Sequence, residues 1–152
     1  MKKWLVALIL VAGAFVGFVY YALRLTFADS VYTRRGMPAY YIVMRSPVIR
    51  NCPVIRNTDN PVFYYDCGDG PAPLVYSISY HSQERCETLV QRLEEYLCAR
   101  GLSVVQRDDA GGYIELSHGT KDYYVISEPS EDGIVEVTVI EEVWDNQRLG
   151  SP

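Results

Sequence analysis

The chain has few of the residues, and none of the short motifs, that usually carry enzymatic chemistry. Its 152 residues include two histidines, His81 and His118, and four cysteines, none of which forms a C-x-x-C pair. The patterns G-x-x-x-x-G-K-S/T, G-x-G-x-x-G and G-x-S-x-G, typical of phosphate, dinucleotide and hydrolase sites, do not occur. Zinc sites usually show closely spaced pairs of ligands, which are also missing. We therefore expect no metal site, no cofactor and no enzymatic activity.

Acidic residues are almost missing from the first 57 positions, where Asp29 stands against eight lysines and arginines. From residue 58 onward there are 18 acidic and six basic residues, so the two parts carry net charges of +7 and −12. Nucleic acid requires a basic face, so the second part excludes it as a partner. The basic part could contact anionic lipid or an acidic partner, or carry dispersed charge with no partner. Its possible interaction surface comprises Arg34, Arg35, Arg45, Arg50 and Arg56.

One long hydrophobic run lies near the start of the chain. Trp4–Leu23 contains twenty consecutive residues without a charge. A helix of that length spans about 30 Å, the thickness of the hydrocarbon core of a bilayer. Secretory signal peptides usually have a shorter apolar region, of about 7–15 residues, and are then cleaved. We predict an uncleaved signal-anchor helix over residues 1–24, with residues 4–23 in contact with membrane lipid.

Two glycines in this run have the spacing of a helix-pairing motif. Gly13 and Gly17 form a G-x-x-x-G pair, which allows a second helix to approach closely. Glycine is also common in membrane helices that do not pair. The pair predicts a possible homodimer through Gly13 and Gly17.

The four cysteines predict the compartment. Cys52, Cys67, Cys86 and Cys98 are even in number and follow an export-type segment, which favours at least one disulfide. If residues 83–100 form one helix, Cys86 and Cys98 lie about 18 Å apart along it and cannot bond to each other. Cys52–Cys67 is the favoured pair, and two crosslinks from Cys52 and Cys67 to the helix are the alternative. We therefore expect a single-pass protein of the cell membrane whose C-terminal domain is extracytoplasmic, or periplasmic in a bacterium.

The rest of the chain is expected to form one α+β domain. We assign residues 25–37 to a juxtamembrane stalk, 38–146 to the domain and 147–152 to a flexible tail. Between residues 39 and 65 we expect short extended pieces: Ala39–Met44, the repeated pentapeptides Pro47–Asn51 and Pro53–Asn57, and Pro61–Tyr65.

The second half of the chain has clearer periodicity. Alternation predicts a strand from Leu74 to Tyr80, and apolar residues three and four apart predict an amphipathic helix over Gln83–Arg100, capped by Ser82. Further strands are expected at Leu102–Arg107, Tyr113–Ser117, Asp122–Ser127 and Ile134–Trp144. This order gives a β-α-β-β-β core, a two-layer domain with one helix on a mostly antiparallel sheet.

Two functional hypotheses follow from these expectations. The first is a membrane-anchored, extracytoplasmic protein-interaction module, either a non-enzymatic accessory or assembly component of a cell-envelope complex or an inhibitor-type binder. Abundant tyrosine and arginine favour it, because both are enriched in binding hot spots. The second is a small ligand-binding or hydrolytic domain that uses His81 or His118 with carboxylates in turns, such as Asp66, Asp69, Asp108 and Asp109.

Overall fold

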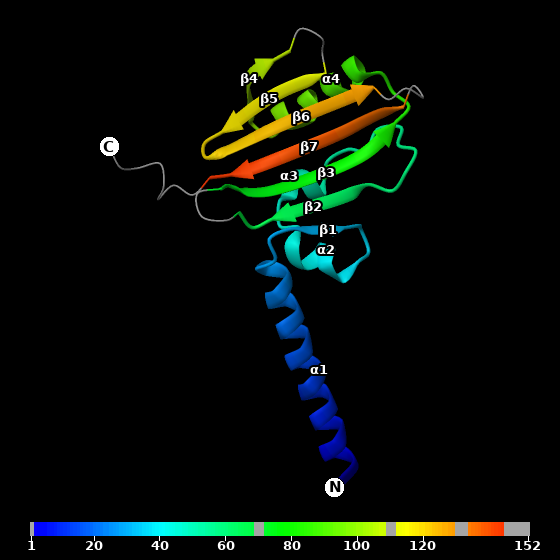
Figure 1. The fold of residues 1–152 in the computed structure, drawn as a ribbon, viewed down its shortest axis with the longest axis vertical. Helices are drawn as coiled ribbons and strands as arrows, with labels where there is room; N and C mark the ends of the chain where they lie inside the picture. The colour runs from blue at the N-terminus through cyan, green and yellow to red at the C-terminus, as the bar shows by residue number, and fades with distance from the viewer. Residues whose placement is uncertain (1, 69–71, 109–111, 130–133, 145–152) are drawn as a thin grey trace, which may run out of the picture.

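A long helix leads into an open sheet of seven strands in a computed structural model of the protein, which describes residues 2–68, 72–108, 112–129 and 134–144 (Figure 1). The helix, α1, covers Lys2–Thr26. Its segment Lys3–Thr26 has a mean hydropathy of 2.3 in its most apolar window and no buried residue there. It is therefore long and apolar enough to cross a membrane, as predicted, although a signal sequence would pass the same test.

The seven strands pair antiparallel throughout, in the order β1-β2-β3-β7-β6-β5-β4. Their bounds are Val31–Thr33 for β1, Val62–Asp66 for β2, Leu74–Ser82 for β3, Ser103–Arg107 for β4, Tyr113–His118 for β5, Lys121–Pro129 for β6 and Val135–Val143 for β7. The predicted α+β fold class is confirmed. Because β3 and β4 are four places apart in this order, they run in the same direction, as the expected helical crossover between them requires.

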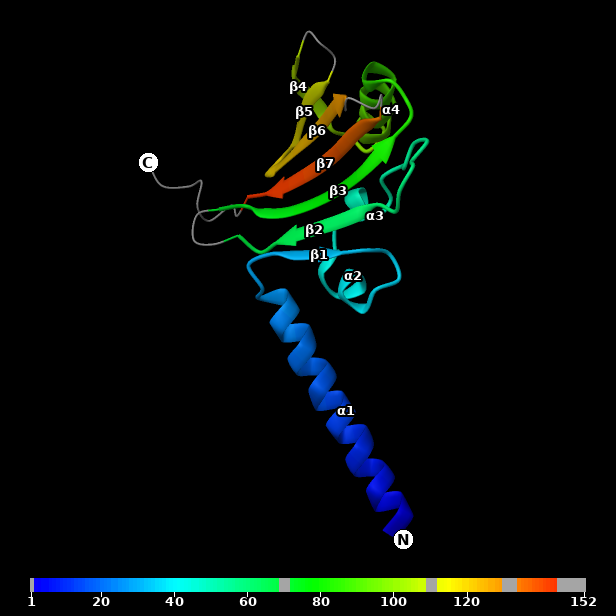
Figure 2. The same ribbon diagram turned by 45° about the vertical axis from the view of Figure 1, so that its right-hand side comes forward.

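Three helices follow α1, and all of them contact one face of the sheet (Figures 1 and 2). They are α2 (Pro38–Val43), α3 (Pro47–Arg50) and α4 (Cys86–Cys98). The ring of Tyr40 in α2 lies 4.8 Å from that of Phe63 in β2. The hydroxyl of Tyr96 in α4 donates to the carbonyl of Val48 in α3, at 2.7 Å, which joins these two helices.

The predicted amphipathic helix is present as α4. Its buried residues are Leu89, Val90, Leu93 and Leu97, at the expected spacings of three and four. The prediction of its cap is wrong. Ser82 ends β3, donates its hydroxyl to the carbonyl of Ile55 and accepts from the backbone N–H of Glu84, whereas Arg85 occupies the N-cap position.

The strand expected over Ala39–Met44 is wrong, because this segment forms α2. Pro38 stands at the start of the helix, where its missing N–H costs no hydrogen bond. Tyr40, Val43 and Met44 are buried, at helical rather than alternating spacing. Packing against the sheet therefore overrides the strand preference of a short aromatic and β-branched run.

The repeated pentapeptide adopts two different structures. The first copy forms α3, where Ser46 caps the helix by accepting a hydrogen bond from the N–H of Ile49 at 3.1 Å. The expectation of an extended piece is wrong for this copy. The second copy has no regular secondary structure: its chain bends at Arg56, where φ is +42°, and it ends in an isolated antiparallel bridge between Asn57 and Ser82. Within the range assigned to the stalk, β1 pairs with β2, while the expected tail at 147–152 lies outside the described residues.

Candidate interaction surfaces

The face of the sheet away from the helices carries no helix among the described residues (Figure 1). Successive side chains of a strand point to opposite faces. Those on the helix side form the core, and fully buried examples are Phe63, Ile78, Leu116, Val125 and Val139. We call the opposite side the open face. It consists of the even-numbered residues of β1, β2, β6 and β7 and the odd-numbered residues of β3 and β5.

The open face is acidic. None of the strand positions that define it is a lysine or an arginine, and its only basic group is His81. Its six carboxylates belong to Asp66, Glu115, Asp122, Glu128, Glu136 and Glu142. Like charges that are not neutralised across a sheet repel each other, so this face attracts cationic groups.

Two pairs of carboxylates stand directly opposite each other on β6 and β7. Asp122 is the register partner of Glu142, and Glu128 is the partner of Glu136. Burial raises the pKa of Glu142, and the charges of Asp122 and Glu115 act in the same direction, against a hydrogen bond from Tyr124. Opposed like charges destabilise a sheet. His81 of β3 stands directly opposite Glu136, so it is the Asp122–Glu142 pair that costs stability in the free protein and would be relieved by a basic partner.

Tyrosine hydroxyls are bonded to several of these acids. Tyr64 donates to Asp66 at 2.7 Å, Tyr113 to Glu115 at 3.4 Å and Tyr124 to Glu142 at 3.4 Å. The bond to Asp66 raises the pKa of Tyr64 to about 12. These tyrosines stay neutral at physiological pH and present rings beside carboxylates, a combination suited to contact with arginine or lysine.

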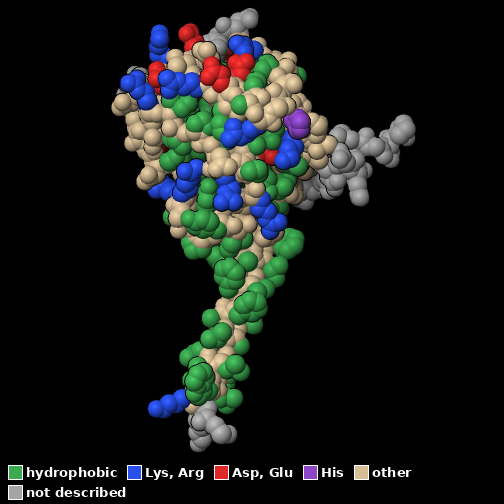
Figure 3. Space-filling view, turned by 180° about the vertical axis from the view of Figure 1, so that it is seen from behind, with side chains coloured by type: hydrophobic (Ala, Val, Ile, Leu, Met, Phe, Trp, Pro, Cys, Tyr) green, Lys and Arg blue, Asp and Glu red, His purple; other side chains and the backbone are tan. Residues whose placement is uncertain are grey.

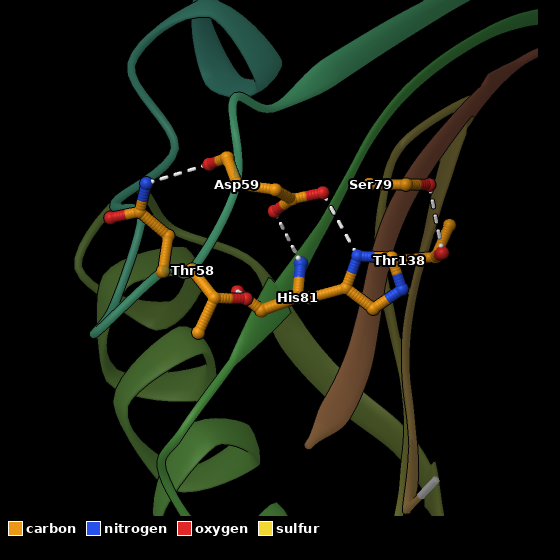
Figure 4. A network of polar contacts seen from close by, with 6 residues as sticks. Thr58, Asp59, Ser79, His81 and Thr138 are labelled. Atoms are coloured by element: carbon orange, nitrogen blue, oxygen red, sulfur yellow. Dashed lines mark hydrogen bonds and ion pairs between the residues drawn. The ribbon is translucent and has the colours of Figure 1, made fainter. Parts of the chain in front are cut away.

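His81 forms an ion pair at one end of the open face (Figure 4). Asp59 accepts from the backbone N–H of His81 and contacts its Nδ1, both at 2.9 Å, and beside them the hydroxyls of Ser79 and Thr138 lie 2.9 Å apart. The hydrogen bond to Asp59 raises the pKa of His81. Burial would raise the pKa of Asp59, but the bonds from His81 outweigh it and lower that pKa. The pair ties the 57–61 loop to β3.

His118 lies in a separate cleft of about 360 Å³. Arg100 and Lys121 line the same cleft, over an apolar base that includes Val48 and Leu102. The ring of His118 contacts the carbonyl of Gly101 through Nδ1 at 3.1 Å. The two histidines therefore belong to different sites. Of the turn carboxylates considered with them, Asp69 and Asp109 lie outside the described residues.

The predicted arginines form only part of one surface. Arg34 and Arg35 line a groove of about 440 Å³ together with Phe63, and Arg35 donates to the carbonyl of Arg50 at 2.6 Å. Arg45 follows α2. Arg56 contacts Glu84 at 3.6 Å. Seen from the helix side, Lys and Arg side chains spread over the lower part of the domain, above the hydrophobic junction with α1 (Figure 3).

The predicted pairing glycines are exposed on α1. A Cβ built on Gly13 or Gly17 would meet nothing within 4 Å in the chain. Both positions are thus accessible to a second helix, and the pairing stays a prediction.

The four cysteines are free thiols in the structure. Cys52 is buried, Cys67 and Cys86 are half-buried, and Cys98 is exposed at the end of α4. Burial raises the pKa of the Cys52 thiol to about 12, which makes it a poor nucleophile. The favoured Cys52–Cys67 bond is not formed here and stays a prediction from the sequence.

Glu141 was not singled out by the sequence analysis, although it interrupts a run of inward-facing valines in β7. It is completely buried and accepts hydrogen bonds from Ser46, in the segment between α2 and α3, and from Lys121 at 3.0 Å. This carboxylate ties the segment between α2 and α3 to the sheet. The sequence could have indicated it, because a charged residue at an inward-facing position of an alternating strand is almost never buried without a partner.

The chain matches no known protein-family model, no curated protein and no solved structure.

Proposed function

We propose that the protein is a membrane-anchored interaction module whose open face binds a basic partner protein. The two opposed acid pairs, Asp122 with Glu142 and Glu128 with Glu136, carry this proposal. Opposite charges on facing strands stabilise a sheet, and like charges directly opposite each other destabilise it. A face that keeps six carboxylates and no lysine or arginine gives up some stability and gains attraction for cations.

The three bonded tyrosines supply the apolar part of such an interface. Tyrosine combines a large ring with a hydroxyl that tolerates water, so it is enriched where proteins bind each other. Ile126 and Ile140 lie half-buried on the same face, Ile126 opposite Tyr113 and Thr138 and Ile140 opposite Tyr124 and Ser77. The face thus offers apolar contact within a ring of acids.

We place α1 in the bilayer and the domain on the extracytoplasmic side, as an accessory or assembly component of an envelope complex or an inhibitor-type binder. Lys2 and Lys3 before the span support this orientation. Arg24, Arg34 and Arg35 after it weigh against it, and the free thiols lend it no support. A reporter active only outside the cytoplasm, fused after Pro152, is expected to be active. Retention of the full-length chain after alkaline carbonate washing tests the anchor separately.

Charge-neutral variants test the interface. We expect D122N/E142Q to lose most of the partner bound by the full-length protein in its native membrane. The matched control, E87Q/E95Q, removes the same charge from exposed positions of α4 and should bind normally. A photo-crosslinker at Thr138 should capture the same partner, whereas one at Gln91 should not. Equal binding by both double variants, or a partner with an acidic surface, would refute the proposed interface.

A second candidate function is the binding of a small anion in the His118 cleft. It is favoured by the convergence of Arg100, His118 and Lys121 on one cleft with an apolar base. We expect H118A to weaken such a ligand and H81A to leave it unchanged, because the two histidines lie at different sites. Isothermal titration of each variant with a panel of small carboxylates and phosphates distinguishes this candidate from the protein-binding one.

A further inference from the structure

Five exposed residues lie on the segment that joins α1 to the domain, from the end of α1 into α2. Phe27 follows the helix and is 75% exposed, and Tyr41 in α2 is 66% exposed. Met37, just before α2, is 50% exposed. The helix α2 contacts α1 and lies beside its upper end in both ribbon views (Figures 1 and 2). We call Phe27, Arg34, Arg35, Met37 and Tyr41 the basal surface.

The basal surface combines apolar side chains with unneutralised positive charge. The side chain of Arg34 has no hydrogen-bond or ion-pair partner among the described residues. The guanidinium of Arg35 donates to the carbonyl of Arg50 and lies 5.7 Å from the centre of the Phe63 ring. Both arginines line the 440 Å³ groove, whose other walls include Met37, Val54 and Pro61. The nearest acid in sequence is Asp29.

This composition matches the interface of a bilayer. Aromatic and aliphatic side chains settle at the level of the headgroups, and arginine binds phosphate through two N–H groups. Because α1 continues into the basal surface, the bilayer that holds α1 lies next to it. The positive charge of the basal surface repels a basic protein. The basic partner proposed above would bind the open face of the sheet, which is a different surface.

We propose that the basal surface docks on anionic phospholipid headgroups, with Arg34 and Arg35 binding a lipid phosphate in the groove. The inference rests on one part of the proposed function, the insertion of α1 in a bilayer. Docking would hold α2 against the membrane and limit the directions in which the open face can point.

Amide hydrogen exchange of the full-length chain in nanodiscs tests the docking. We compare discs of phosphatidylcholine with discs that also contain phosphatidylglycerol, and follow residues 34–45. Each basic residue near an anionic surface strengthens binding roughly fivefold, so we expect exchange in this segment to slow several-fold in the anionic discs. Exchange in β4, at the far edge of the sheet, should not change. Salt at about 1 M, which shortens the screening length to roughly 3 Å, should abolish the difference.

Matched variants assign the effect to the two arginines. R34Q removes a side chain that has no hydrogen-bond or ion-pair partner among the described residues, so the variant should fold normally. Its amide exchange in anionic discs should be about fivefold faster than that of the unchanged protein. R34Q/R35Q should lose nearly all of the protection. The control R85Q/R92Q removes the same charge at and within α4 and should keep the full effect.

Three results would overturn the inference. They are equal exchange in the two kinds of disc, full protection in R34Q/R35Q, and equal protection by soluble glycerol phosphate added to phosphatidylcholine discs. The last result would show that the groove binds a free anion and not the bilayer. Failure of the chain to enter nanodiscs at all would instead refute the anchor on which the proposed function depends. Binding of the partner protein by the open face is tested separately, with D122N/E142Q, and none of these results decides it.

Discussion

Asp122 and Glu142 face each other across β6 and β7 with no lysine or arginine on the same face of the sheet. Asp122 also accepts a hydrogen bond from Nε1 of Trp144, at 2.9 Å, and Glu142 accepts one from Tyr124. Each carboxylate thus has a neutral donor, and neither forms an ion pair within the described part of the chain. The two neutral donors partly stabilise the carboxylates, which can still bind a cationic group of another molecule.

Removal of one charge of this pair should stabilise the free protein. We expect D122N to raise the free energy of unfolding by about 0.2–1 kcal/mol, since an amide oxygen can still accept from Trp144. Chemical denaturation of the full-length chain in detergent measures the change. E87Q serves as the control and should have little effect. A loss of stability in D122N would show that the acid pair is not repulsive.

The same pair predicts a dependence of stability on pH. The pKa of Glu142 is raised in the folded state, so the folded protein holds this proton more tightly than the unfolded chain. The resulting stability is fully present below the model-peptide pKa of 4.5 and is lost as the pH rises through the folded pKa. In D122N this decline should be smaller. Titration of Glu142 by NMR in both proteins, showing a lower pKa in D122N, is the direct check.

His81 should report on its partner in the 57–61 loop. Its pKa is raised above 6.5 by the hydrogen bond to Asp59, so the ion pair adds stability below that pH and loses it as the pH rises through the folded pKa. We expect D59N to return the pKa of His81 toward 6.5, measured from its ring protons. His118, whose ring contacts the carbonyl of Gly101 instead, provides the internal control. An unchanged His81 pKa in D59N would mean that the pair does not form in solution.

The buried carboxylate of Glu141 should make Lys121 important for stability. Lys121 is 39% exposed, whereas Glu141 is completely buried. K121M leaves the buried charge with fewer donors, and we expect a loss of about 1–3 kcal/mol in unfolding free energy. R92M is the matched control, on the exposed face of α4. A double variant, K121M/E141M, should recover part of the loss, because both charged groups are then absent.

The cysteines should differ in reactivity in the order of their exposure. With four free thiols, Cys98 should react first with maleimide at neutral pH, and Cys52 only after unfolding, because its thiolate is disfavoured by burial. Peptide mapping without reductant measures both the labelling and any bonds. Recovery of a Cys52–Cys67 peptide would contradict the free thiols and restore the expectation from the sequence.

The predictions from the sequence were most accurate where one strong periodic signal was present. The helix α4 and the later strands β5, β6 and β7 were predicted close to their observed bounds, because their apolar residues repeat at 3.6 or at two residues. The region between residues 38 and 57 was predicted poorly, because its apolar runs are short. Such runs fit a strand or a buried helix equally well until a neighbouring surface selects one.

The candidate site was almost invisible in the sequence for a related reason. Acids in β6 and β7 read as ordinary outward-facing residues of two strands. Only the register sets Asp122 opposite Glu142, and only the strand order leaves both without a basic neighbour. The arginines were predicted as an interaction surface from the sequence. Only the path of the loops places Arg34 and Arg35 in the groove and Arg56 beside Glu84.

The sequence by itself determined the apolar helix α1, the α+β class and the division of charge, because each depends on composition or on local period alone. The tertiary structure decided the two fates of the repeated pentapeptide. Pro47–Asn51 begins after Ser46, whose hydroxyl caps a helix and also donates to the buried Glu141. Pro53–Asn57 follows Cys52, and its last residue pairs with Ser82 at the end of β3. Five identical residues thus form a helix in one place and an irregular segment in the other. Their local preference for either conformation is weak, so contacts with distant partners decide between them.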